Sequence, residues 1–247
     1  LELGDPNSPL CTADGTDAVA LVQKNPRLRK LVLLARNIDT ETLFTLPMPQ
    51  LERLWVDFGA RYPLRRLAEN ASLRNLTHLW LDPRPEYPLA PVNPGEMDEL
   101  ELVEAIMERE QSTDLTPEVH TPEEVDSFFA SPNFPKVAHL RLRLTGIGDW
   151  ACEAVVRHGW LRRLETLDLC QTGMTDEGAH ALARCPDLGR LKQLDVQGNR
   201  LTRDGIAALE RADIRLHARY QIGGAGYPED DDFGFGGGPT GIEVIDL

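Results

Sequence analysis

The sequence predicts an α/β fold, a right-handed solenoid in which a parallel sheet lines the concave side and helices lie outside. The main observation is a repeat of 27 residues: the apolar spacing of residues 164–178 recurs without gaps at 137–151 and 191–205. The pattern L-x-x-L-x-L that opens each unit also occurs, at looser spacings, at 28–33, 51–56 and 76–81. Units that each have one apolar face bury it by stacking, so this repeat predicts a solenoid.

Each repeat is expected to begin with a short strand. Alternate side chains of a strand point to the same side, so Leu167 and Leu169 face the core while Thr166 and Asp168 reach the opposite, solvated face. A polar residue with a short side chain follows each strand, where it can hydrogen-bond the backbone of the turn. These polar residues are Thr145, Thr172 and Asn199.

A helix is expected after each strand and turn. Residues 175–184 (TDEGAHALAR) and 202–211 (TRDGIAALER) combine a Thr, an acid and Ala or Leu at helical spacing, which is typical of a capped helix. Upstream, residues 16–25 predict a helix, and residues 40–49 predict only a short one because Pro interrupts them. Residues 1–3 predict the end of an earlier strand, so the chain is expected to begin inside a repeat.

The pattern resembles the leucine-rich repeat family, whose units of 20–29 residues combine a strand with a helix. The units 164–190 and 191–217 resemble the longer ribonuclease-inhibitor type, and Cys185-Pro186 before the next strand is similar to the cysteine-containing variety. The resemblance covers roughly residues 1–220 and is strongest over 137–210. It implies the fold and says little about function, because such repeats serve many unrelated roles.

The period breaks between Leu76 and Val137. Residues 82–95 contain five prolines and cannot form a central strand, whereas residues 96–111 have the apolar spacing of an amphipathic helix. Residues 121–133 predict an outer helix that leads into the next strand, with a Thr cap and a Pro just inside. We therefore interpret residues 1–222 as one solenoid with an insertion at 83–118. The insertion either binds a partner or is a degenerate repeat that maintains stacking.

Residues 223–247 form a Gly/Asp-rich acidic tail after the last repeat. Four consecutive acids at 229–232 lack the alternating oxygen ligands and the Gly of a calcium loop. The sequence therefore predicts a solvated tail and no metal site.

Composition narrows the class of partner. The chain has 26 basic and 40 acidic residues, a net charge of −14, which argues against nucleic acid and anionic membranes as partners. The sequence contains no run of 18 apolar residues, so it predicts no membrane span. The four cysteines form no C-x-x-C pair, so free thiols in a reducing compartment are expected. We expect a soluble, bacterial and cytoplasmic protein.

The sequence offers no catalytic motif. Cys170 follows a strand, but no helix N-terminus or cationic neighbour evident in the sequence lowers its pKa, and the six histidines are scattered. We therefore predict a protein without catalytic activity or cofactor. The alternative is a regulatory or recognition segment of a larger multidomain protein or enzyme, with its catalytic part outside this chain.

The concave face is the candidate binding surface. Equivalent positions of stacked strands form ladders about 4.8 Å apart, and these ladders change from aromatic to cationic to acidic along the sheet. Trp and Arg are the residues most enriched among binding hot spots, so the ladders predict recognition of a protein or peptide. The candidate partner-binding residues are Trp55, His78, Trp80, His139, Arg141, Arg143, Asp168 and Asp195.

A structural role for the same residues stays open. Trp55 and Trp80 pack in a small satellite core if the 83–118 insertion covers them. Arg141 and Asp168 then form only a weak surface pair across two strands.

Overall fold

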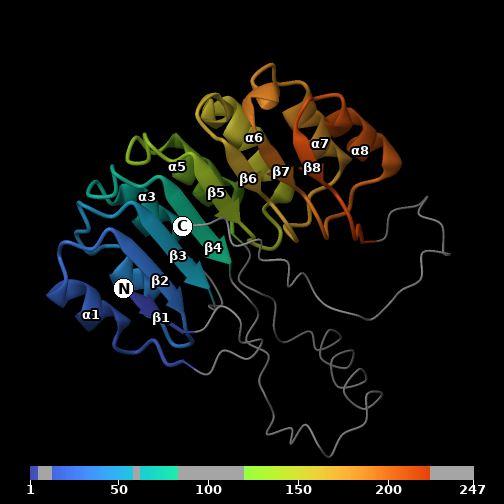
Figure 1. Cartoon of the computed structure of the whole chain (residues 1–247). Coiled ribbons are helices and arrows are strands. Elements are labelled where there is room, and N and C mark those ends of the chain that lie inside the picture. The colour runs from blue at the N-terminus through green and yellow to red at the C-terminus, as the bar shows by residue number, and fades with distance from the viewer. Residues whose placement is uncertain (5–12, 58–61, 83–119, 223–247) are drawn as a thin grey trace, which may run out of the picture.

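The computed structural model describes residues 1–4, 13–57, 62–82 and 120–222. Their strands form one parallel sheet of eight strands, in which each strand pairs with the next one along the chain (Figure 1). This open sheet with helices is the predicted α/β solenoid. The strands are β1 (Glu2–Leu3), β2 (Lys30–Leu34), β3 (Arg53–Asp57), β4 (His78–Asp82), β5 (His139–Leu142), β6 (Thr166–Asp168), β7 (Gln193–Asp195) and β8 (Arg215–His217).

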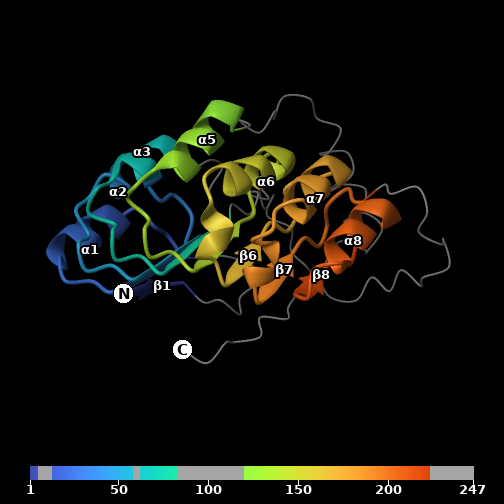
Figure 2. The ribbon, with the colours of Figure 1, turned by 90° about the horizontal axis from the view of Figure 1, so that it is seen from above.

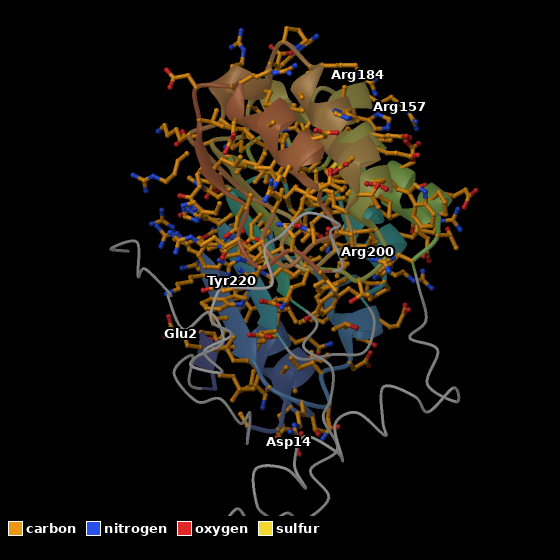
Figure 3. The ribbon with its side chains drawn as sticks, turned by 90° about the vertical axis from the view of Figure 1, so that its right-hand side faces the viewer. Glu2, Asp14, Arg157, Arg184, Arg200 and Tyr220 are labelled. Atoms are coloured by element: carbon orange, nitrogen blue, oxygen red, sulfur yellow. The ribbon has the colours of Figure 1, made fainter. Side chains whose placement is uncertain are left out.

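The described helices lie on one face of this sheet (Figure 2). We call the other sheet face the open face, because no described helix covers it. Figure 3 shows Arg157 and Arg184 with the helices, and Glu2 and Tyr220 on the side of the strands. The helices are α1 (Ala18–Lys24), α2 (Thr40–Leu43), α3 (Leu64–Glu69), α5 (Pro122–Ala130), α6 (Gly148–Arg157), α7 (Asp176–Ala183) and α8 (Arg203–Glu210), with 3₁₀ turns at η1 (Trp160–Arg162) and η2 (Leu188–Arg190).

The register of the sheet is the one that the repeat spacing predicts. Trp55 pairs with Trp80, and Arg141 pairs with both Trp80 and Asp168, so equivalent positions of successive units lie side by side. β4 pairs directly with β5 although their first residues, His78 and His139, are 61 positions apart in the sequence. The break in the period therefore leaves the sheet continuous.

The core lies between the sheet and the helices. The strand residues that point toward the helices, such as Leu167 and Leu169, are at most 1% exposed. Beneath β5, the side chains of Phe128, Phe134 and Trp160 pack together, and Trp160 Nε1 donates a hydrogen bond of 2.8 Å to the Phe129 carbonyl. Each unit thus buries its apolar face against its neighbours, as stacking requires.

Polar contacts join successive helices at their N-termini. Asp149 at the start of α6 accepts hydrogen bonds from Thr175, the cap of α7, and from the Gly178 backbone at 3.0 Å. One unit later, Asp176 accepts hydrogen bonds from Thr202, the cap of α8. A Cβ at Gly178 would collide with the Asp149 carboxylate, so glycine is required for this close approach.

Two of the three polar residues that follow the strands, Thr172 and Asn199, form the predicted hydrogen bonds with the backbone of the turns. Asn199 is fully buried and its amide accepts from the Thr172 and Met174 N–H groups and donates to the Leu169 and Val196 carbonyls, at 2.8–3.0 Å. The Thr172 hydroxyl donates to Leu169 as well. The prediction is wrong for Thr145, which is exposed and whose hydroxyl forms no hydrogen bond within the described ranges.

The helix predictions at 16–25, 40–49, 121–133, 175–184 and 202–211 are confirmed as α1, α2, α5, α7 and α8. α5 begins with the expected Thr121 cap and Pro122, and Glu124 completes a capping box. The insertion at 83–118, with its helix at 96–111, and the tail at 223–247 lie outside the described residues. Within the described ranges, no helix has the length and apolar character needed to cross a membrane.

Candidate functional site

Aromatic side chains form the centre of the open face. The rings of Trp55 and Trp80 meet edge to face with centroids 5.1 Å apart, and the ring of His78 lies 6.1 Å from that of Trp80. The Arg141 guanidinium lies over the Trp80 ring at 5.1 Å. Both Trp side chains are half-buried, so each presents part of its ring to solvent. Edge-to-face pairs of this kind are rigid platforms of large apolar area.

Two histidines extend this platform. His78 and His139 stack with centroids 4.2 Å apart, and each is hydrogen-bonded through Nδ1 to a threonine hydroxyl, Thr77 at 2.8 Å and Thr166 at 3.1 Å. Burial, together with the neighbouring His139 and Arg53, lowers the pKa of His78 to about 4, and burial also lowers that of His139. Both imidazoles are therefore neutral at pH 7 and act as flat polar surfaces.

Next to the aromatic platform lies an ion-pair network. Asp168 accepts from Arg141 Nε at 2.7 Å and from Arg143 Nη2 at 2.9 Å, and the Cys170 backbone donates to it at 3.0 Å. Arg143 also reaches Asp82 at 3.4 Å, so it bridges β4 and β6. Only 17% of the Arg143 side chain and 12% of the Asp168 side chain are exposed. The network therefore joins three strands at a site that is largely shielded from water.

The two acids of neighbouring strands have pKa values shifted in opposite directions. Burial works to raise the pKa of Asp168, but Arg143 and Arg141 more than offset it and hold the pKa below its usual range. The pKa of Asp195 is raised, because burial and the adjacent Asp168 both disfavour its charge. The surroundings therefore favour the charged form of Asp168 and disfavour the charged form of Asp195.

Three potential metal-ligating groups meet in this region. Atoms of Asp168, Cys170 and Asp195 lie within 4.8 Å of one another. The Arg143 guanidinium already supplies the positive charge at Asp168, and burial raises the pKa of Cys170 to about 12. A protonated thiol beside a guanidinium is a poor cation ligand and a poor nucleophile.

The prediction that Asp168 reaches a solvated face is wrong. Asp168 is 9% exposed, as is Asp195 at the equivalent position of the next strand, because side chains of strands about 4.8 Å apart cover one another. The Arg141–Asp168 contact is not an isolated surface pair. It is shared with Arg143 and belongs to the shielded network described above.

Sequence reasoning did not select two further residues of this face, Asp82 and Arg53, or the core residue Tyr62. Asp82 binds Arg143, and Arg53 lies beside His78 and lowers its pKa. Tyr62 follows β3 in the loop, is fully buried and donates to the Val56 carbonyl at 3.0 Å, with its pKa raised by burial and by Asp57 and Asp82. Arg53 and Asp82 lie at the repeat positions of the selected residues His78 and Arg143, whereas Tyr62 follows no repeat pattern.

The helix layer offers an alternative surface. A groove of about 690 Å³ lies between α7 and α8, and a smaller one of about 410 Å³ lies between α6 and α7. Small Ala side chains at the helix contacts leave this space, and Arg184, Cys185 and Pro186 line both grooves.

Comparisons with known proteins place this chain in no established family. No protein-family model matches the sequence, and no curated protein matches it. A solved structure from Bacteroides fragilis, a structural-genomics target, is similar at 16% sequence identity and a TM-score of 0.46. The similarity covers 91% of this chain and 65% of that structure, so this chain spans just under two thirds of its length. A likeness this distant supports no conclusion about function.

Proposed function

We propose that this chain is a non-catalytic binding protein that recognises a protein or peptide on its open face. The observation that carries the proposal is the Trp55–Trp80 pair, which lies half-buried on a sheet face that no described helix covers. Arg141 and the two stacked histidines surround it. Aromatic rings and Arg at the centre of a surface are the usual anchors of a protein interface.

The mechanism is rigid presentation of these side chains. Parallel pairing fixes the backbone of β3, β4 and β5, and ring contacts with the Arg141 ion pair fix the side chains. A partner therefore meets groups that are already ordered, and little conformational entropy is lost on binding. Asp82 and Asp168 are paired with arginines and shielded from water. The half-buried rings of Trp55 and Trp80 are therefore the groups that we expect to anchor the partner.

Residue chemistry favours binding over catalysis. The histidines are held neutral by burial, and the raised pKa of Cys170 keeps its thiol protonated. The alternative function is that of a recognition segment within a larger multidomain protein or enzyme, for which the same face would serve. Assignment to the ribonuclease-inhibitor-like leucine-rich repeats rests on leucine spacing, and the bacterial, cytoplasmic origin stays a prediction.

The test compares tryptophans on the two sides of the molecule. The full chain, immobilised, is used to capture partners from native lysate, which mass spectrometry identifies. We expect Trp55→Ala and Trp80→Ala to lose the partner and Trp150→Ala, at an exposed position of α6, to keep it. If all three variants keep the partner while melting within a few degrees of the wild type, the open face is not the binding surface.

A further inference from the structure

The helix layer has a row of arginines at equivalent repeat positions. Arg157, Arg184 and Arg211 are 27 residues apart and lie at the C-terminal ends of α6, α7 and α8, and Figure 3 shows the first two on the helix side. Arg157 is bound by Asp126 at 2.7 Å and by Glu153 at 3.6 Å. The exposed guanidinium groups of Arg184 and Arg211, in contrast, form no hydrogen bond or ion pair with any described residue. These two arginines are therefore available to an anionic group of a partner.

Each groove of the helix layer lies between two members of this row. Arg184 and Arg211 line the groove of about 690 Å³, and Arg157 and Arg184 line the groove of about 410 Å³. Arg184 therefore belongs to both grooves. The remaining lining consists largely of small apolar side chains, among them Val156, Ala181, Ala207 and Ala212. Each groove thus offers room for an apolar side chain next to a cation.

The acid of the larger groove lies at the opposite end from its arginines. Asp204 is in the first turn of α8, seven residues before Arg211, which is about 10 Å along the helix axis. Glu210 and Asp213 are close to Arg211 in the sequence but line neither groove. The end of this groove at the helix C-termini is therefore cationic, and a partner is oriented with its negative charge toward Arg184 and Arg211.

We propose that the two grooves bind an acidic peptide segment of a second protein, with one apolar side chain in each groove and a carboxylate on Arg184 between them. α7 packs against both α6 and α8, so the grooves are roughly one interhelical distance of 8–10 Å apart. A peptide in the polyproline II conformation has three residues per turn, so its apolar residues at positions i and i+3 face the same side about 9 Å apart. This site is on the opposite side of the sheet from the open face and does not depend on it.

Fluorescence anisotropy with the full chain tests this site. The probe is a fluorescein-labelled peptide, Gly-Ser-Leu-Asp-Glu-Leu-Ser-Gly, and the matched peptide has Asn-Gln in place of Asp-Glu. An exposed ion pair changes affinity by about two- to fivefold, so we expect the acidic peptide, which meets two arginines, to bind about tenfold more tightly than the neutral one. The difference should shrink in 1 M salt, because salt screens exposed charges.

Substitutions locate the bound peptide. Arg184→Gln removes the charge that both grooves share and should weaken the acidic peptide about fivefold. Ala207→Leu fills the larger groove from an exposed position and should weaken both peptides. Arg203→Ala, an exposed arginine of α8 that lines neither groove, is the matched control and should change nothing. Trp55→Ala on the open face should also leave the affinity unchanged.

Several outcomes would overturn the proposal. Equal affinity for the two peptides, or an unchanged affinity in Arg184→Gln, would remove the charge complementarity. A loss of binding in Trp55→Ala but not in Arg184→Gln would place the peptide on the open face. Sedimentation of the chain alone provides a further check, since a dimer that dissociates in Arg184→Gln would assign the grooves to a second copy of the chain.

Discussion

Replacing Asp168 by Asn isolates the charge at the centre of the open-face network. Asn keeps the size of the side chain and can still hydrogen-bond, but it removes the anion that holds Arg141 and Arg143. Asp82, at 3.4 Å from Arg143, is then the remaining acid of the network. We expect a clear loss of stability, because two guanidinium groups lose their principal counter-charge in a shielded site.

The magnitude follows from the two contacts. Hydrogen bonds to charged groups contribute about 1.5–3 kcal/mol each, which gives about 3–6 kcal/mol for the two arginines. The share of Arg141 is discounted, because 27% of its side chain is exposed and water replaces part of the lost contact. A loss of about 2–4 kcal/mol remains, which corresponds to a fall in melting temperature of roughly 5–15 °C for a chain of this size.

The neighbouring acid provides the matched control. Asp195 occupies the same ladder position one strand away, but its pKa is raised, so Asp195→Asn should leave stability unchanged or increase it by up to about 1 kcal/mol. Urea unfolding of both variants and the wild type at pH 7 gives the comparison. A loss below about 1 kcal/mol in Asp168→Asn, or an equal loss in Asp195→Asn, would refute the reasoning.

Further substitutions test other parts of the fold. Because the pKa of Asp168 is lowered in the folded protein, its contribution to stability is complete above the unfolded pKa of about 3.9 and is lost as the pH falls through the folded pKa. We therefore expect the free energy of unfolding of Asp168→Asn to fall less steeply at acid pH than that of the wild type. Asn199→Ala should cost about 3–5 kcal/mol in urea unfolding, because it leaves several buried backbone groups without partners. Thr121→Ala should cost about 1 kcal/mol by removing the cap of α5, measured in the same way. Gly148→Ala should cost about 1–3 kcal/mol, since its Cβ would collide with the Met174 backbone, whereas Gly189→Ala, with open space around it, should stay within about 0.5 kcal/mol of the wild type.

The repeat made the architecture predictable from sequence. The L-x-x-L-x-L pattern recurs after 25 residues from β3 to β4 and after 27 from β5 to β6, so it predicts that Trp55 pairs with Trp80 and Arg141 with Asp168. The helix caps at Thr175 and Thr202 were predictable for the same reason, since each recurs at an equivalent position.

The burial of the open face was not predictable in this way. Alternation places Asp168 and Asp195 on the side away from the helices, but it does not say how far neighbouring side chains cover them. Arg143 reaches both Asp82 and Asp168 because a long side chain spans several strands. Such contacts depend on three-dimensional packing rather than on spacing.

Photo-crosslinking of the partner distinguishes the open face from the helix grooves most directly. A photoreactive residue placed at Gln193, on β7 of the open face, is compared with one at Ala207, which lines the groove between α7 and α8. With the purified partner bound, the account predicts crosslinks from position 193 and none from position 207. Crosslinks from position 207 alone would show that the partner binds the helix layer and would contradict the account.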